Sequence, residues 1–197
     1  TFHVRHEVFP DRVLQILQAL ELGDVFDSVT QADRQLKRMR DLGLIQEAGS
    51  DPTLSLKGSH IVQIVVKRNN LWGDLGHFLH YTLWDRTTPS ANGFSWFYRS
   101  FCEHLWQEGV FRISDKATLK ALCADFNNRI EEDEVFQPYL AGNPSLSTDS
   151  VSGIQHWLEV LNPPVIENDT FTRRTFCPPE LLLLAIGWAF RDEPDPI

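Results

Sequence analysis

The sequence lacks an apolar run of the length that a membrane-spanning helix needs, which is about 20 residues. The apolar stretch 181–186 is far shorter and follows two prolines. The first residues contain no basic start followed by an apolar stretch, so we expect no secretory signal peptide. These absences predict a cytoplasmic protein that does not associate with membranes.

Cysteine is also scarce. The three cysteines, Cys102, Cys123 and Cys177, are widely spaced and form no CxxC pair. This pattern indicates neither a zinc finger nor a disulfide framework. We expect reduced thiols, as is usual in the cytoplasm.

Motifs for catalysis and for metal binding are missing too. The sequence contains no GxSxG, no phosphate-binding GxxxxGK, no GxGxxG and no HExxH. His77 with His80, and Cys102 with His104, come nearest to metal-ligand pairs, but neither pair has a recognised metal spacing. The acidic run 131–134 is typical of a solvated surface. We therefore predict a non-catalytic protein without catalytic residues, bound metal or cofactor.

The net negative charge comes from one part of the chain. The net charge is −9, yet residues 1–70 balance nine Lys and Arg against nine Asp and Glu. Residues 71–197 hold nine basic and eighteen acidic residues. An acidic body repels a nucleic-acid backbone, whereas a neutral half with a basic helix can meet one. The split predicts two domains, 1–70 and 71–197.

The stretch from Thr30 to Ile45 carries the clearest local signals. Thr30 is suited to cap a helix, and Gly43 stands where a left-handed residue would end it. Apolar residues recur between them at helical spacing, at Ala32, Leu36, Met39 and Leu42. A strand from 44, a polar turn at 48–52 and a return strand at 54–56 follow. With a helix over 57–68, this order predicts a winged helix-turn-helix.

The same patterns place the remaining elements. An extended arm covers residues 1–10, Asp11 caps a helix that ends near Leu22, and a short helix covers 25–29. Further helices are predicted over 72–84, 94–108, 114–128 (capped by Ser114), 151–161 and 180–190, with a loop over 138–153 and a hairpin over 165–177. The last helix is nearly all apolar, so we expect it to be buried. The predicted fold is mainly α with a small β-wing: an N-terminal winged helix-turn-helix followed by an aromatic-rich helical domain.

The basic helix is the strongest functional lead. In winged helices this helix usually enters the major groove of DNA, and the wing reaches the flanking backbone. Arginine and lysine favour guanine and phosphate, and glutamine can read adenine. The candidate DNA-binding residues are Arg34, Gln35, Lys37, Arg38 and Lys57. The alternative is a solvated helix face in a winged helix that serves protein contacts.

The chain carries His6-Glu7-Val8-Phe9 with Arg12 near its start, and later aromatic segments at 71–84 and 95–98. In these segments it resembles a bacterial family of unknown function found in phage-defence islands, beside genes for DNA phosphorothioation and related systems. Val13-Leu14-Gln15 stands where that family has Gly-Trp-Leu. The resemblance implies a non-catalytic component of a defence complex that recognises DNA or a partner.

Two main functional hypotheses follow. In the first, the chain is a DNA-binding winged-helix component of an antiviral defence or regulatory complex, with double-stranded DNA and other proteins of the complex as partners. In the second, it is a protein-interaction scaffold that uses the same fold without DNA. A third hypothesis is a ligand-sensing transcription regulator whose aromatic helices form a small-molecule pocket. The sequence leaves a homodimer open.

Overall fold

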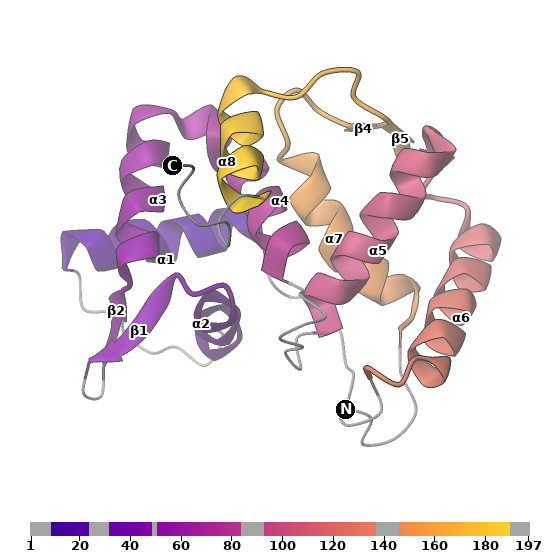
Figure 1. The fold of residues 1–197 in the computed structure, drawn as a ribbon, viewed down its shortest axis with the longest axis horizontal. Helices are drawn as coiled ribbons and strands as arrows, with labels where there is room; N and C mark the ends of the chain where they lie inside the picture. The colour runs from indigo at the N-terminus through magenta and orange to yellow at the C-terminus, as the bar shows by residue number, and fades with distance from the viewer. Residues whose placement is uncertain (1–8, 24–31, 49–50, 84–92, 137–145, 190–197) are drawn as a thin grey trace, which may run out of the picture.

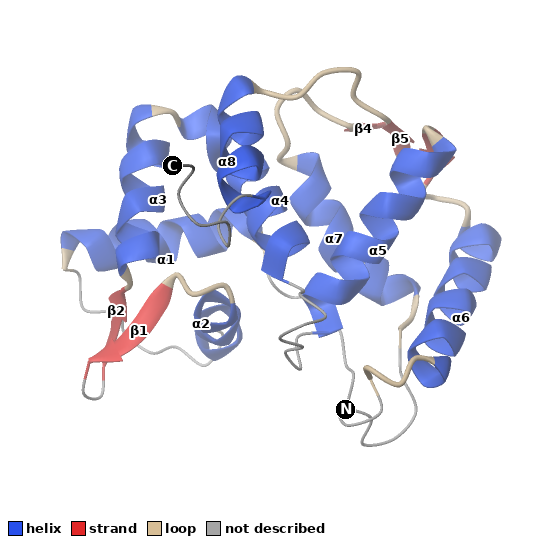
Figure 2. Cartoon of the chain, in the orientation of Figure 1, coloured by secondary structure: helices blue, strands red, loops and turns tan. Residues whose placement is uncertain are grey.

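We describe a computed structural model of the chain over residues 9–23, 32–48, 51–83, 93–136 and 146–189 (Figure 1). It is mainly helical, with a two-stranded and a three-stranded antiparallel sheet (Figure 2). Residues 1–8 of the predicted arm, the short helix predicted at 25–29 and the capping residue Thr30 lie outside the described residues, and Pro10 of the arm belongs to the first helix. None of the described helices has the length and apolar character that crossing a bilayer requires.

The first part of the chain builds two helices, a hairpin and a third helix. These elements are α1 (Pro10–Leu22), α2 (Ala32–Asp41), β1 (Ile45–Ala48), β2 (Asp51–Leu54) and α3 (Leu56–Lys67). The strands pair antiparallel, with Ile45 opposite Leu54. Ser55 caps α3, because its side chain accepts a hydrogen bond of 3.0 Å from the backbone N–H of Gly58. The helix expected over 57–68 is confirmed.

The second part packs helices rich in aromatic residues against one another. The 3₁₀ turn η1 (Asn69–Leu71) leads into α4 (Trp72–Leu83), followed by α5 (Gly93–Glu108), α6 (Lys116–Glu132) and α7 (Thr148–Glu159). Strand β3 (Val110–Arg112) pairs with β5 (Thr170–Thr172), which also pairs with β4 (Ile166–Glu167). This sheet confirms the hairpin predicted over 165–177 and adds β3 to it. Helix α6 lies at the opposite end of the molecule from the β1–β2 hairpin (Figure 1).

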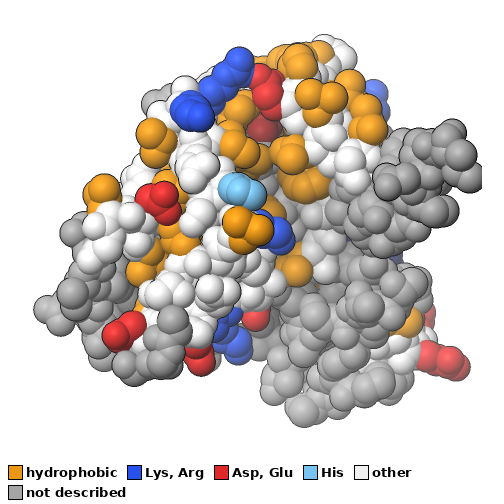
Figure 3. Space-filling view, turned by 60° about the vertical axis from the view of Figure 1, so that its left-hand side comes forward, with side chains coloured by type: hydrophobic (Ala, Val, Ile, Leu, Met, Phe, Trp, Pro, Cys, Tyr) orange, Lys and Arg blue, Asp and Glu red, His pale blue; other side chains and the backbone are white. Residues whose placement is uncertain are grey.

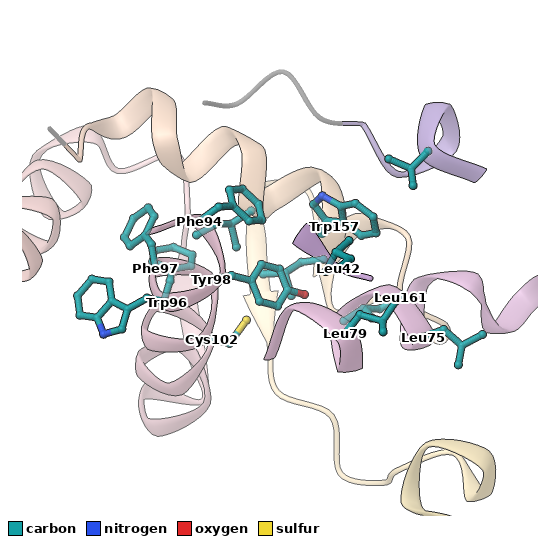
Figure 4. Close-up of a cluster of buried hydrophobic side chains, with 14 of the residues drawn as sticks. Leu42, Leu75, Leu79, Phe94, Trp96, Phe97, Tyr98, Cys102, Trp157 and Leu161 are labelled. Atoms are coloured by element: carbon teal, nitrogen blue, oxygen red, sulfur yellow. The ribbon is translucent and has the colours of Figure 1, made fainter. Parts of the chain in front are cut away.

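A single cluster of buried hydrophobic side chains joins the two parts. It includes Val13 and Met39 from the first part and Phe97, Trp157 and Phe171 from the second. Leu42, which follows α2, is 1% exposed and lies near the aromatic side chains of α5 and α7 (Figure 4). The described segments on either side of residue 70 therefore share one core.

Some boundaries differ from the sequence predictions. Phe9, not Asp11, is the N-cap residue of α1, because Pro10 already occupies the first helical turn. Asp115, not Ser114, caps α6, and its carboxylate accepts hydrogen bonds from the N–H groups of Ala117 and Thr118. Helix α6 continues to Glu132, and α7 occupies 148–153, where a loop was expected.

The last helix, α8 (Pro179–Ala189), forms where the sequence predicts it but is not buried. Leu182, Leu183 and Ile186 are 50%, 68% and 46% exposed. Only part of the helix packs inward, with Leu184 against the core. Hydrophobic side chains accordingly gather at the top of the surface in Figure 3, the end of the molecule where α8 lies in Figure 1. Apolar composition was therefore a wrong guide to burial here.

Candidate nucleic-acid interface

Helix α2 is held by its apolar stripe and by contacts at its C-terminal end. Leu36, Met39 and Leu42 are buried. Gly43 follows in the left-handed conformation, with φ of 68°, and this confirms the predicted end of the helix. Its carbonyl accepts a hydrogen bond of 2.6 Å from the hydroxyl of Ser55. The hairpin and α3 therefore fix the position of α2.

Two of the predicted base-reading side chains point into the protein. Gln35 is only 7% exposed. The Arg38 guanidinium lies over the Phe94 ring of α5, 4.8 Å from its centroid, and forms an ion pair of 3.5 Å with Asp41. Burial lowers the pKa of Arg38, and the charge of Asp41 partly opposes this shift. Both side chains therefore contribute to packing between α2 and its surroundings.

Other basic side chains of α2 face solvent. Lys37 is exposed, and so is Arg40, whose guanidinium makes an ion pair of 3.2 Å with Glu47 on β1. Arg34 lies in α2, but its side chain is outside the described residues. Arg40 therefore stands beside the β1–β2 hairpin, the element predicted as the wing.

Lys57 has a structural contact of its own. Its ammonium group donates a hydrogen bond of 3.0 Å to the carbonyl of Leu42, at the negative end of α2. Partial burial lowers the pKa of Lys57. The four sequence-predicted side chains that the structure describes are thus not gathered on one face: Lys37 is open to solvent, Lys57 caps the helix end, and Gln35 and Arg38 are packed.

One of the histidines considered as metal ligands, His80, is part of the core. His80 is fully buried, with its ring 4.5 Å from that of Trp157 and 5.0 Å from that of Phe94. Burial and the nearby charge of Arg38 hold the pKa of His80 well below its usual value, so the ring is neutral. No group of three side chains suited to hold a metal occurs within the described ranges.

The sequence patterns did not predict one buried ion pair, between Arg174 and Asp74. The Arg174 guanidinium contacts the Asp74 carboxylate at 2.6 Å, and the two side chains are 8% and 3% exposed. The partners lie far apart in the sequence, in α4 and in the segment before α8. Local patterns therefore could not pair them, and the only signal was Asp74 in the first turn of a helix with no other acidic residue.

Comparison with known proteins identified no relative of this chain. No family model, no curated protein and no solved structure matches this chain.

Proposed function

We propose that this chain is a non-catalytic winged helix-turn-helix protein that contacts the phosphate backbone of double-stranded DNA within a bacterial defence or regulatory complex. The order α1, α2, β1–β2 hairpin and α3 supports the winged-helix assignment. The observation that carries the proposal is the exposure of Lys37 and Arg40 on α2, with Arg40 in contact with Glu47 of the hairpin. Exposed cations on such a helix supply the electrostatic contacts on which DNA affinity depends.

The proposed contact is with DNA phosphates and not with base edges. Gln35 and Arg38, the side chains suited to base edges, are engaged with the protein interior and with Phe94. Phosphate contacts position a protein on the duplex but carry no sequence information directly. We therefore expect this chain to bind duplexes of different sequence with similar affinity.

The distribution of charge sets the strength of such binding. Residues 71–197 carry an excess of nine acidic residues, from eighteen acidic and nine basic, and repel DNA. The proposed favourable contacts lie on the α2 side of the first part. We expect weak binding that falls steeply as salt rises, and other members of the complex would add affinity in the cell.

The test compares two variants that remove the same charge. Lys37→Ala/Arg40→Ala alters α2, whereas Lys116→Ala/Lys120→Ala removes two exposed lysines of α6. Binding of two unrelated fluorescent duplexes is measured at low and at moderate salt. We expect about a tenfold loss of low-salt affinity in the α2 variant only, and equal affinity for both duplexes. Equal losses in the two variants would contradict a contact through α2.

A second function is favoured by the inward side chains. Because Gln35 and Arg38 pack against the protein, the same fold can serve as a scaffold between proteins without reading DNA. Absence of duplex binding by the folded wild-type chain at low salt would reject the first proposal and favour this one. Binding that the α2 variant loses would reject the scaffold without DNA.

A further inference from the structure

A cavity of about 570 Å³ lies between α4, α5 and the segment that enters α8. Its volume falls within the range of about 300–1,000 Å³ that is usual for small-molecule sites. The side chains that the argument uses are His77, Tyr81, Glu103, Trp106, Arg174 and Phe176. None of them belongs to the α2 surface described above.

Aromatic rings form much of the lining. The His77 ring is stacked with Trp106, with centroids 5.9 Å apart and planes at 26°. The centroid of Tyr81 lies 5.8 Å from that of His77, and Phe176, 56% exposed, lines the cavity from the segment before α8. Such walls favour flat, apolar ring systems that stack on them.

Arg174 supplies a hydrogen-bond donor whose positive charge is balanced by Asp74. Its Nη1 donates to Asp74 and its Nε donates a hydrogen bond of 3.0 Å to the Pro163 carbonyl. Its Nη2 has no hydrogen-bond partner within the described residues, although it is buried. An unsatisfied buried donor is costly, so an acceptor is favoured once the side chain turns Nη2 toward the cavity that Arg174 lines. Because Asp74 already balances the guanidinium, a neutral carbonyl suits this position better than a carboxylate.

Glu103 supplies an acceptor. Its Oε1 accepts hydrogen bonds from the Tyr81 hydroxyl at 3.1 Å and from Nε of Arg99 at 2.9 Å, which fix the carboxylate. An ionised carboxylate offers about four acceptor positions, so Glu103 can still accept a hydrogen bond from a ligand N–H. The Arg99 charge balances that of Glu103 as Asp74 balances that of Arg174.

The chemistry of the lining indicates binding and not reaction. Burial raises the pKa of the Cys102 thiol far above its usual value, which makes it a poor nucleophile. Burial and the Arg174 charge lower the pKa of His77 to about 4, so its ring is neutral at physiological pH. Its Nδ1 is already engaged with the Tyr98 hydroxyl, 2.9 Å away.

We propose that this cavity binds a planar, uncharged heteroaromatic molecule that carries a carbonyl acceptor and an N–H donor. The rings stack against the aromatic walls, the carbonyl accepts from Arg174, and the N–H donates to Glu103. The inference concerns a ligand site in the second part of the chain and does not depend on DNA binding by α2.

Cys177 provides a built-in reporter for occupancy. It lines the cavity and is the exposed cysteine of the chain, whereas Cys102 and Cys123 are buried. Alkylation of Cys177 by iodoacetamide is followed by peptide mass spectrometry on the full chain. The probe is quinolinone, a planar bicyclic lactam. It is compared with N-methylquinolinone, which lacks the N–H donor, and with naphthoate, which is charged.

We expect quinolinone to slow the alkylation of Cys177, N-methylquinolinone to need about tenfold higher concentration for the same effect, and naphthoate to be weaker than quinolinone. No protection by quinolinone, or protection by naphthoate at least as strong, would overturn the proposal.

Variants then locate the binding site. Glu103→Ala should abolish the difference between quinolinone and its N-methyl derivative, whereas Glu108→Ala, a matched change of an exposed glutamate on α5, should preserve it. Phe176→Ala should weaken both lactams about three- to tenfold without altering their ratio. A difference between the two lactams that persists in a folded Glu103→Ala variant would exclude the proposed role of Glu103.

Discussion

At the residue scale, close approach between α4 and α7 depends on the absence of a side chain at Gly76. A Cβ atom there would lie 2.4 Å from Cζ3 of Trp157. At Gly73 the same atom would lie 1.9 Å from the carbonyl oxygen of Val160. Glycine inside a helix costs about 1 kcal/mol relative to alanine. The packing of the buried Trp157 ring offsets this cost.

We expect Gly76→Ala to lower the free energy of unfolding by about 1–3 kcal/mol, because the indole must move within a packed core. Gly187→Ala is the matched control, since a Cβ atom there meets nothing within 4 Å in α8. That change should raise stability by up to about 1 kcal/mol through helix propensity. Urea unfolding measures the stability of both variants. A stability gain in Gly76→Ala would show that the Trp157 ring leaves room for a Cβ atom at this position.

Residues whose role is local could be predicted from the sequence, and residues whose role is tertiary could not. Gly43 was identified as the end of α2 because a helix C-terminus has its own chemical pattern. Gly76 carries no such signal, because glycine is required there by the Trp157 indole, which lies far along the chain. The inward orientation of Arg38 could not be predicted for the same reason, because the Phe94 ring that it covers lies in another helix.

At the element scale, helical periodicity located α4, α5 and α8 well but did not reveal which faces are covered. The charged and apolar pattern of α2 located the buried Leu36, Met39 and Leu42, but it did not reveal that Gln35 and Arg38 also pack inward. Helix α8 has almost no polar residues, so its sequence contains no such contrast. Strand β3 was missed since three residues after a helix give no periodicity to detect.

The exposed and inner sides of α8 should respond differently to charge. We expect Leu183→Lys, at a side chain 68% exposed, to change the free energy of unfolding by less than about 0.5 kcal/mol. Leu184→Lys, the adjacent residue packed on the core, should cost about 1–2 kcal/mol. Thermal or urea unfolding compares them directly. Equal losses would mean that the outer face of α8 is covered in solution.

At the scale of the whole molecule, neutral histidines buried beside positive charges couple folding to pH. Burial lowers the pKa of both rings, and the charge of Arg38 beside His80 and that of Arg174 beside His77 lower it further. In the folded chain the pKa of His77 is about 4, whereas an unfolded histidine titrates near its ordinary value of 6.5. Between these values the unfolded chain binds more protons, so stability falls as pH decreases.

We therefore expect the wild-type chain to lose stability as pH falls from about 6.5 toward 4, and the variant His77→Gln to lose less. The difference in slope should approach about 1.4 kcal/mol per pH unit, the value for one proton. His60→Gln, which alters an exposed histidine of α3, should retain the wild-type slope. Urea unfolding at a series of pH values supplies the slopes. If His77→Gln and wild type run parallel, the His77 ring is protonated within the folded protein and the neutral lining inferred for the cavity is wrong.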